Sequence, residues 1–145
     1  MGQQDSMIDA LYRSAAASYG LTACEMWIYY FLLIEHETED GGEAGVTQQT
    51  ICSHMMFPKQ TVNSAVQKLA ANGMLTIEPS RSGGRAKVLR LTAEGLAFAK
   101  STVAHLVDVE MRAAEKLGLK KLSRIVALRD EFYCIIKKEL NNKRQ

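Results

Sequence analysis

A helix predicted over residues 58–71 constrains the fold and the function of this chain more than any other stretch. Pro58 stands at or near its first position, where the missing N–H leaves no hydrogen bond unmade, and Asn72-Gly73 stops it. Apolar residues repeat at i, i+3, i+4 and i+7 along one face: Val62, Ala65, Val66 and Leu69. We therefore expect one side of this helix to pack on a core.

The other side of the helix carries amides, hydroxyls and ammonium groups and no carboxylate: Lys59, Gln60, Thr61, Asn63, Ser64, Gln67 and Lys68. An ordinary solvated surface mixes both charge signs, whereas an acid-free surface suits a polyanion. Gln and Asn can pair bidentately with adenine, Ser and Thr can contact base edges, and Lys can meet phosphate. We predict that this side reads the major groove of duplex DNA, and a merely polar surface helix is the alternative.

The flanking segments predict a helix-turn-helix followed by a β-hairpin. Upstream, Thr47 can cap a short helix that runs to about Met55, and a tight turn joins it to the next helix. Downstream, residues 74–78 and 87–91 read as strands around a glycine-rich loop, residues 79–85, which we call the wing loop. Cations lie in or beside it, where a hairpin tip can reach a minor groove or a phosphate: Arg81, Arg85 and Lys87.

These features resemble the winged helix of the MarR family of bacterial transcriptional regulators. The matching residues follow the family's order and spacing: Leu21-Thr22, Val46-Thr47-Gln48, Thr61-Val62, Lys68-Leu69, Asn72-Gly73-Met74-Leu75, Gly84-Arg85-Ala86-Lys87 and Leu91-Thr92-Ala93-Glu94-Gly95. Two positions depart from the pattern. Gly83 stands where the family usually has an Asp that supports the wing, and Ser64 stands where many members have an Arg for the groove.

The resemblance implies a mainly α fold with a small β-wing, in which residues 21–95 bind DNA and helices at both ends dimerise. From the residues themselves we predict a helix over 6–18, an all-round apolar core helix from Thr22 to about His36, and long helices over 92–117 and 119–140. The last has a wide apolar stripe that includes Leu122, Phe132 and Ile136. A second copy of the chain is the economical cover for it, with residues 5–19 and 96–140 forming the joint; packing within one chain is the alternative.

Charge is uneven along the chain, although the net charge is only +2. Residues 1–50 hold eight acids and one base, whereas residues 51–104 hold seven bases and two acids. Residues 105–145 hold ten bases and six acids. Positive charge on the winged stretch and the C-terminal helices is the pattern of nucleic-acid binding.

Other candidate sites are weaker. Tyr12, Trp27 and Tyr30 can line a pocket for a small aromatic effector, as the family's fold would allow, and plain core packing is the alternative. Three cysteines have no metal or redox spacing, so we expect buried, reduced thiols, with redox sensing as the alternative: Cys24, Cys52 and Cys134. The histidines have no Cys or His at i+3 or i+4, so we expect neither a metal nor another cofactor.

The sequence as a whole predicts one domain over residues 1–145 that regulates transcription, as a homodimeric repressor on an inverted-repeat operator released by an effector, with an activator as the alternative to a repressor. A winged helix used only for protein interaction is the alternative. No catalytic triad order, carboxylate pair or phosphate-cradling loop is visible, so we expect no enzyme. No long uncharged apolar stretch and no leader is visible either, so we expect a cytoplasmic protein without a membrane partner.

Overall fold

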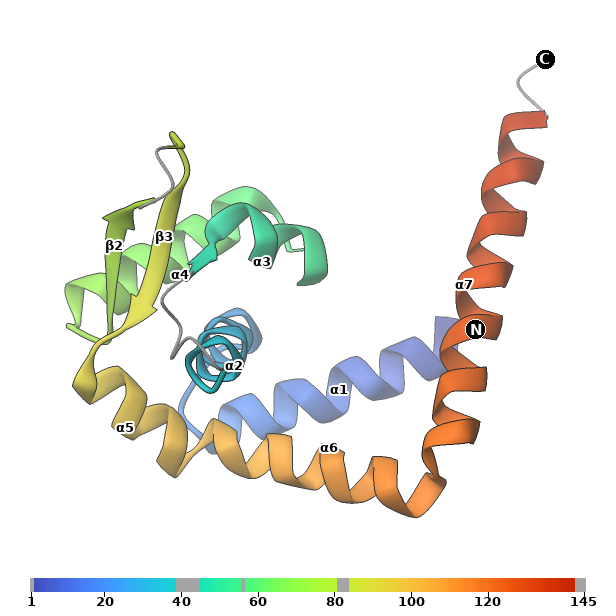
Figure 1. Ribbon diagram of the computed structural model, residues 1–145, viewed down its shortest axis with the longest axis horizontal. Helices are drawn as coiled ribbons and strands as arrows, with labels where there is room; N and C mark the ends of the chain where they lie inside the picture. The colour runs from blue at the N-terminus through green and yellow to red at the C-terminus, as the bar shows by residue number, and fades with distance from the viewer. Residues whose placement is uncertain (1, 39–44, 56, 81–83, 143–145) are drawn as a thin grey trace. The chain divides into compact units, whose positions relative to one another are not determined.

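The computed structural model describes residues 2–38, 45–55, 57–80 and 84–142 (Figure 1). The helices are α1 Gly2–Ser18, α2 Ala23–His36, α3 Gln48–Met55, α4 Lys59–Ala71, α5 Ala93–Ser101, α6 Val103–Leu117 and α7 Leu119–Asn142. The strands are β1 Val46–Thr47, β2 Leu75–Pro79 and β3 Lys87–Leu91. This mainly helical fold with a small antiparallel sheet confirms the predicted fold class. The chain forms two compact units, residues 1–107 (the winged unit) and 108–145 (the C-terminal unit).

Helix α2 is the centre of the winged unit, and Figure 1 views it nearly along its axis. It begins at a capping box: the Glu25 backbone N–H donates to Thr22 Oγ1, and the Thr22 backbone N–H donates to the Glu25 carboxylate. Its contacts include α1, α3, α4, α5 and the sheet. Met26, Ile28 and Tyr29 are almost fully buried, so the predicted core helix is confirmed.

The sheet has three strands in the order β1-β3-β2, whereas the sequence predicted a two-stranded hairpin. Strand β1 pairs with β3 through Val46 opposite Leu89, and β2 pairs with β3 through Ile77 opposite the same Leu89. The missed strand is two residues long, too short to show an alternating pattern. Its pairing anchors the start of α3 to the middle strand of the sheet.

The long helix predicted over residues 92–117 is wrong, because it is broken at Thr102 into α5 and α6. Thr102 leaves the helical conformation, with φ −127° and ψ −77°. Its hydroxyl donates to the Phe98 carbonyl at 2.7 Å, the type of local bond that competes with helical pairing. The start at Thr92 and the end at Gly118, which has a positive φ of 89°, are as predicted.

A tight joint connects the end of α4, the start of β2 and the start of α5. The Thr92 hydroxyl donates to the Gly73 carbonyl at 2.6 Å and accepts from the Gly95 N–H at 3.0 Å. The Thr92 N–H donates to the Met74 carbonyl at 3.1 Å. A Cβ added at Gly95 would overlap that Met74 carbonyl oxygen, so only glycine fits at this position.

The C-terminal unit contains the rest of α6 and all of α7. Within residues 108–142 no side chain is classed as buried. Many large apolar side chains of α7 are instead exposed, among them Leu119 at 72%, Tyr133 at 48% and Leu140 at 61%. An apolar surface of this kind is typical of a helix that another surface covers.

Candidate nucleic-acid interface

Helix α4 presents the two sides that its sequence predicts. Pro58 is its N-cap residue, with φ −54° and ψ 138°, and the helix itself begins at Lys59. The apolar face is buried, as predicted, and consists of Val62, Ala65, Val66 and Leu69. The predicted DNA-reading residues are all exposed: Lys59, Gln60, Thr61, Asn63, Ser64 and Gln67. The fold therefore holds an acid-free polar surface toward solvent.

One flank of α4 borders a groove of about 680 Å³ next to the hairpin. It brings Lys59 and Asn63 of α4 together with Arg85 and Lys87 from the end of the wing loop and the start of β3. The groove is lined by Thr47, Gln48, Gln49, Cys52, Lys59, Asn63, Arg85, Ala86 and Lys87. Three of these residues are cations and none is an acid, so the groove suits a phosphate backbone. Arg81 lies outside the described residues.

Gln48 and Gln49 of α3 line this groove and were not predicted as site residues. They follow the cap at Thr47, whose hydroxyl accepts from the Thr50 N–H at 3.1 Å. A signal for them exists in the sequence, because no Asp or Glu occurs from Gly45 to Ile77. The acid-free run therefore covers α3 as well as α4, and the candidate surface is wider than one helix.

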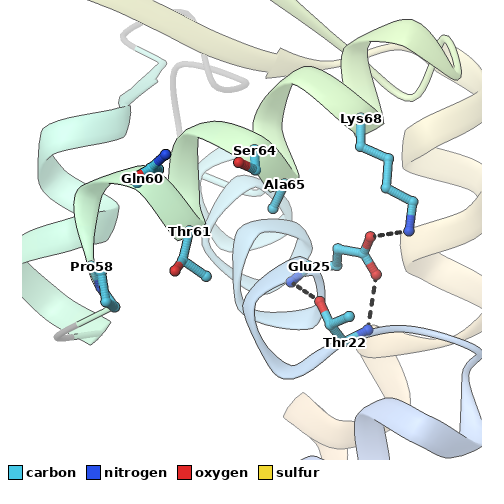
Figure 2. A pocket seen from close by; sticks show the side chains of 8 residues that line it. All are labelled: Thr22, Glu25, Pro58, Gln60, Thr61, Ser64, Ala65 and Lys68. Atoms are coloured by element: carbon cyan, nitrogen blue, oxygen red, sulfur yellow. Dashed lines mark hydrogen bonds and ion pairs between the residues drawn. The ribbon is translucent and has the colours of Figure 1, made fainter.

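The other flank of α4 borders a second groove, of about 580 Å³, shared with the start of α2 (Figure 2). It is lined by Thr22, Glu25, Pro58, Gln60, Thr61, Ser64, Ala65 and Lys68. Figure 2 shows Lys68 reaching from α4 to Glu25, and the Nζ–Oε1 distance is 2.6 Å. Glu25 is only 4% exposed. Burial alone would raise the pKa of its carboxyl, but hydrogen bonds from Lys68 and Thr22 outweigh burial and lower it.

The base of the hairpin is held by an ion pair between its two strands. Arg90 of β3 donates through Nε to Glu78 of β2 at 3.2 Å, and Thr76 donates to the same carboxylate at 2.9 Å. The Arg90 side chain is 19% exposed, so water screens this pair less than a pair on an open surface. It supports the hairpin in a chain that has Gly83 in place of the family's wing Asp.

The predicted effector residues lie together. The ring centroids of Tyr12 and Trp27 are 4.8 Å apart, and those of Trp27 and Tyr30 are 5.0 Å apart. Tyr12 and Trp27 line a pocket of about 540 Å³, whereas Tyr30 contacts Trp27 without lining it. The lining is Ile8, Asp9, Tyr12, Arg13, Ala23, Trp27, His54, Met55 and Phe57. The sequence did not indicate Arg13 and His54 as pocket residues, because no motif links either of them to both Tyr12 and Trp27.

The cysteines differ in burial, which corrects the expectation that all three are buried. Cys24 is buried, and burial together with the charge of Glu25 raises the pKa of its thiol to about 11, so it stays protonated. Cys52 is intermediate and Cys134 is exposed, because no described residue covers that part of α7. Among the described residues no three His, Cys, Asp or Glu side chains gather as a metal site would require.

The predicted dimer residues lie on the uncovered side of α7. Phe132 is 43% exposed and Ile136 is 37% exposed, while Leu122 is half-buried. No helix in the described part of the chain is long and apolar enough to span a membrane.

The fold and this surface define a winged helix-turn-helix protein. The model of the MarR family matches residues 31–86, so the resemblance predicted from the sequence is confirmed. A search of curated proteins found no match.

Solved structures share the fold over nearly the whole chain. The MarR family regulator NMB1585 from Neisseria meningitidis has a TM-score of 0.78 at 21% identity, covering 98% of this chain and 94% of that one. The S. aureus MepR–DNA complex has a TM-score of 0.64 at 15% identity, covering 92% and 96%. NadR in complex with 4-hydroxyphenylacetate has a TM-score of 0.67 at 20% identity, covering 90% and 86%.

Proposed function

We propose that this chain is a transcriptional regulator that binds duplex DNA sequence-specifically as a homodimer and acts as a repressor in the cytoplasm. The observation that carries the proposal is the groove where Lys59 and Asn63 of α4 meet Arg85 and Lys87. A helix that presents amides beside a cationic hairpin supplies base reading and phosphate binding on one continuous surface. MepR, which has the same fold, has been solved in complex with DNA, which supports DNA binding by this fold.

The residues of this surface have two different roles in the proposal. Gln60 and Asn63 each offer a donor and an acceptor, so they discriminate between base edges in the major groove. Arg85, together with Arg81 and Lys87, offers positively charged donors and no acceptor, and in this proposal binds the phosphate backbone of any sequence. Specificity is therefore assigned to α4 and general affinity to the hairpin.

The test is selection of duplexes from a random pool by the full chain, followed by titration of the selected and a random duplex at several salt concentrations. Asn63→Ala should cost about 1 to 3 kcal/mol on the selected duplex and little on the random one. Arg85→Ala should weaken both duplexes and flatten the slope of log affinity against log salt by about one unit per lost contact. A chain that shows no salt-dependent duplex binding would favour the protein-interaction module instead.

The dimer in this proposal is joined by α1 and the C-terminal helices. It is supported by the exposed apolar side chains of α7, which a second copy would cover. A two-fold dimer carries two copies of α4, so the selected operator should be an inverted repeat. Its half-sites should lie about 34 to 36 Å apart, which is one turn of DNA.

We also propose that a small aromatic effector releases the operator. The pocket that contains Tyr12, Trp27, Arg13 and His54 supports it, because the pocket combines ring surfaces with a cation. NadR, which shares the fold, has been solved with 4-hydroxyphenylacetate. Trp27 is the only tryptophan, so titration with 4-hydroxyphenylacetate should quench its emission in step with DNA release. Release without any change in Trp27 emission would exclude this pocket.

A further inference from the structure

Lys68 belongs to the polar side of α4, yet its charge is compensated within the protein. Its ammonium donates to Glu25 Oε1 at 2.6 Å, across the groove between α4 and α2 (Figure 2). The other carboxylate oxygen, Oε2, accepts from the Thr22 backbone N–H at 2.8 Å. Both oxygens of a nearly buried carboxylate are thus satisfied by groups of this chain. Lys68 therefore differs from Lys59, which lines the opposite groove beside Arg85.

The pair adds a directional bond to the apolar packing between two elements. Helix α4 rests on the core through Val62, Ala65 and Val66, and the hydrophobic effect that holds them there is itself non-directional. A hydrogen bond to a carboxylate fixed by a capping box is directional. Because Lys68 lies on the flank of α4, its bond to Glu25 resists rotation of α4 about its own axis.

A small rotation is enough to matter for base reading. The side chains of a helix end about 5 to 6 Å from its axis, so a rotation of about 10° moves their tips by about 1 Å. Hydrogen bonds tolerate a spread of only about 0.5 Å in donor–acceptor distance. Gln60, Thr61 and Ser64 line the same groove as the ion pair and would move with such a rotation.

We propose that Glu25 and Lys68 are positioning residues that fix the rotation of α4, and that they set operator discrimination without contributing a phosphate contact. This inference rests on the proposed DNA-binding function. It predicts the opposite of what the negative charge of Glu25 alone would do to DNA binding. If charge alone mattered, removing this acid would strengthen binding to every duplex. If the pair positions α4, removing it weakens binding to the preferred duplex alone.

The experiment compares four single variants of the full chain, and the double variant Glu25→Gln/Lys68→Met, on the selected and the random duplex across a salt series. Glu25→Gln keeps a side chain that can complete the capping box but removes the anion. Lys68→Met removes the cation and keeps the length, Lys68→Arg can restore the bond, and Lys59→Gln is the matched control for a phosphate contact.

Glu25→Gln and Lys68→Met should each lower the ratio of selected to random affinity about tenfold, the effect of one well-aligned base contact, with an unchanged salt slope. The double variant Glu25→Gln/Lys68→Met should lower the ratio of selected to random affinity no more than either single variant does. Lys68→Arg should keep most of this ratio. Lys59→Gln should instead weaken both duplexes and flatten the slope by about one unit per lost contact. A Lys68→Met variant that behaves like Lys59→Gln, with Glu25→Gln strengthening both duplexes, would overturn the inference.

Hydrogen exchange of the α4 amides in the free protein tests, separately from DNA binding, whether the Glu25–Lys68 pair holds α4 in place. Both single variants should exchange faster than the wild type along α4, and the double variant should match them. Unchanged protection of α4 in both single variants would overturn the positioning role of the pair, even if the wild type binds DNA. A wild type that binds no duplex would instead overturn the proposed function, and the exchange data would still decide whether the pair holds α4.

Discussion

The winged unit and the C-terminal unit differ in where their apolar side chains lie. In the winged unit α2, α4 and the sheet close around side chains such as Ile28, Ile51 and Val66, which are fully buried. In residues 108–142 no side chain is buried, and Phe132 and Tyr133 stand nearly half-exposed. The winged unit is therefore stabilised by contacts within one chain, whereas the C-terminal unit has surfaces that only another surface can cover. Variants should separate these two kinds of stability.

The largest effect is expected for Gly95→Ala in the winged unit. The added Cβ would overlap the Met74 carbonyl oxygen, and backbone cannot yield as a side chain can. We expect a loss of more than about 4 kcal/mol of unfolding free energy, independent of protein concentration. Urea unfolding followed by circular dichroism measures it. Gly20→Ala is the control, because its φ is +72° but nothing lies within 4 Å, and it should cost only about 1 to 2 kcal/mol. Equal losses would contradict the close approach.

The next effect belongs to the C-terminal unit. Phe132→Asp combined with Ile136→Asp would place two charges on the proposed dimer surface, and hot-spot residues are worth about 2 kcal/mol each. Because both copies carry both substitutions, the dimer dissociation constant should rise at least about a thousandfold, as sedimentation equilibrium would show. Ala127→Asp introduces the same charge on the opposite side of α7, where the residue is exposed, and should leave association unchanged. A wild-type chain that is monomeric at micromolar concentration would remove the dimer from the proposal.

A smaller effect is expected at the N-cap of α5. Thr92→Ala removes the hydroxyl that bonds Gly73 and Gly95, which should cost about 1 kcal/mol. Thr92→Ser keeps the hydroxyl and should retain most of the stability. Thermal unfolding of the three proteins side by side measures the difference. If Thr92→Ser loses as much stability as Thr92→Ala, the methyl group of Thr92 rather than its hydroxyl stabilises the contact between Gly73 and α5.

The smallest effect is the pH dependence that Glu25 contributes. Its pKa is lower in the folded chain than the ordinary value of 4.5, so the folded state binds fewer protons there than the unfolded state. The stabilisation is therefore complete above pH 4.5 and is lost as pH falls through the lower folded pKa. The Lys68 side chain is 62% exposed, so water weakens the stabilisation that its ion pair with Glu25 contributes. The difference in urea midpoint between wild type and Glu25→Gln should shrink on acidification below pH 4.5, and a difference that stays constant would contradict this role.

The sequence predicted most of the winged unit because its signals are local. The caps at Thr22, Thr47 and Thr92 and the stop at Gly73 each act within one turn of a helix, and the spacing of the buried α4 residues directly reflects the helical period. The acid-free surface of α4 was predictable for the same reason. The same acid-free run includes Gln48 and Gln49, but only the folded chain shows that they line the groove beside Asn63.

What the sequence could not predict depends on contacts between distant segments. Strand β1 exists because β3 offers it an edge, and its own residues carry too short a pattern. The ion pair of Glu25 with Lys68 joins residues 43 positions apart, so neither residue alone indicates it. The break at Thr102 has no Gly or Pro to mark it, and the hydroxyl bond back to Phe98 that accompanies it shows only in the folded chain.

The joint at Gly73, Thr92 and Gly95 has a mechanical consequence. Because the Thr92 hydroxyl bonds both Gly73, just after α4, and Gly95, in the first turn of α5, we expect the end of α4 and the start of α5 to move together. The first place beyond this joint where the chain leaves the helical conformation is Thr102. We therefore expect bending between α5 and α6 to occur at Thr102, seven positions after Gly95.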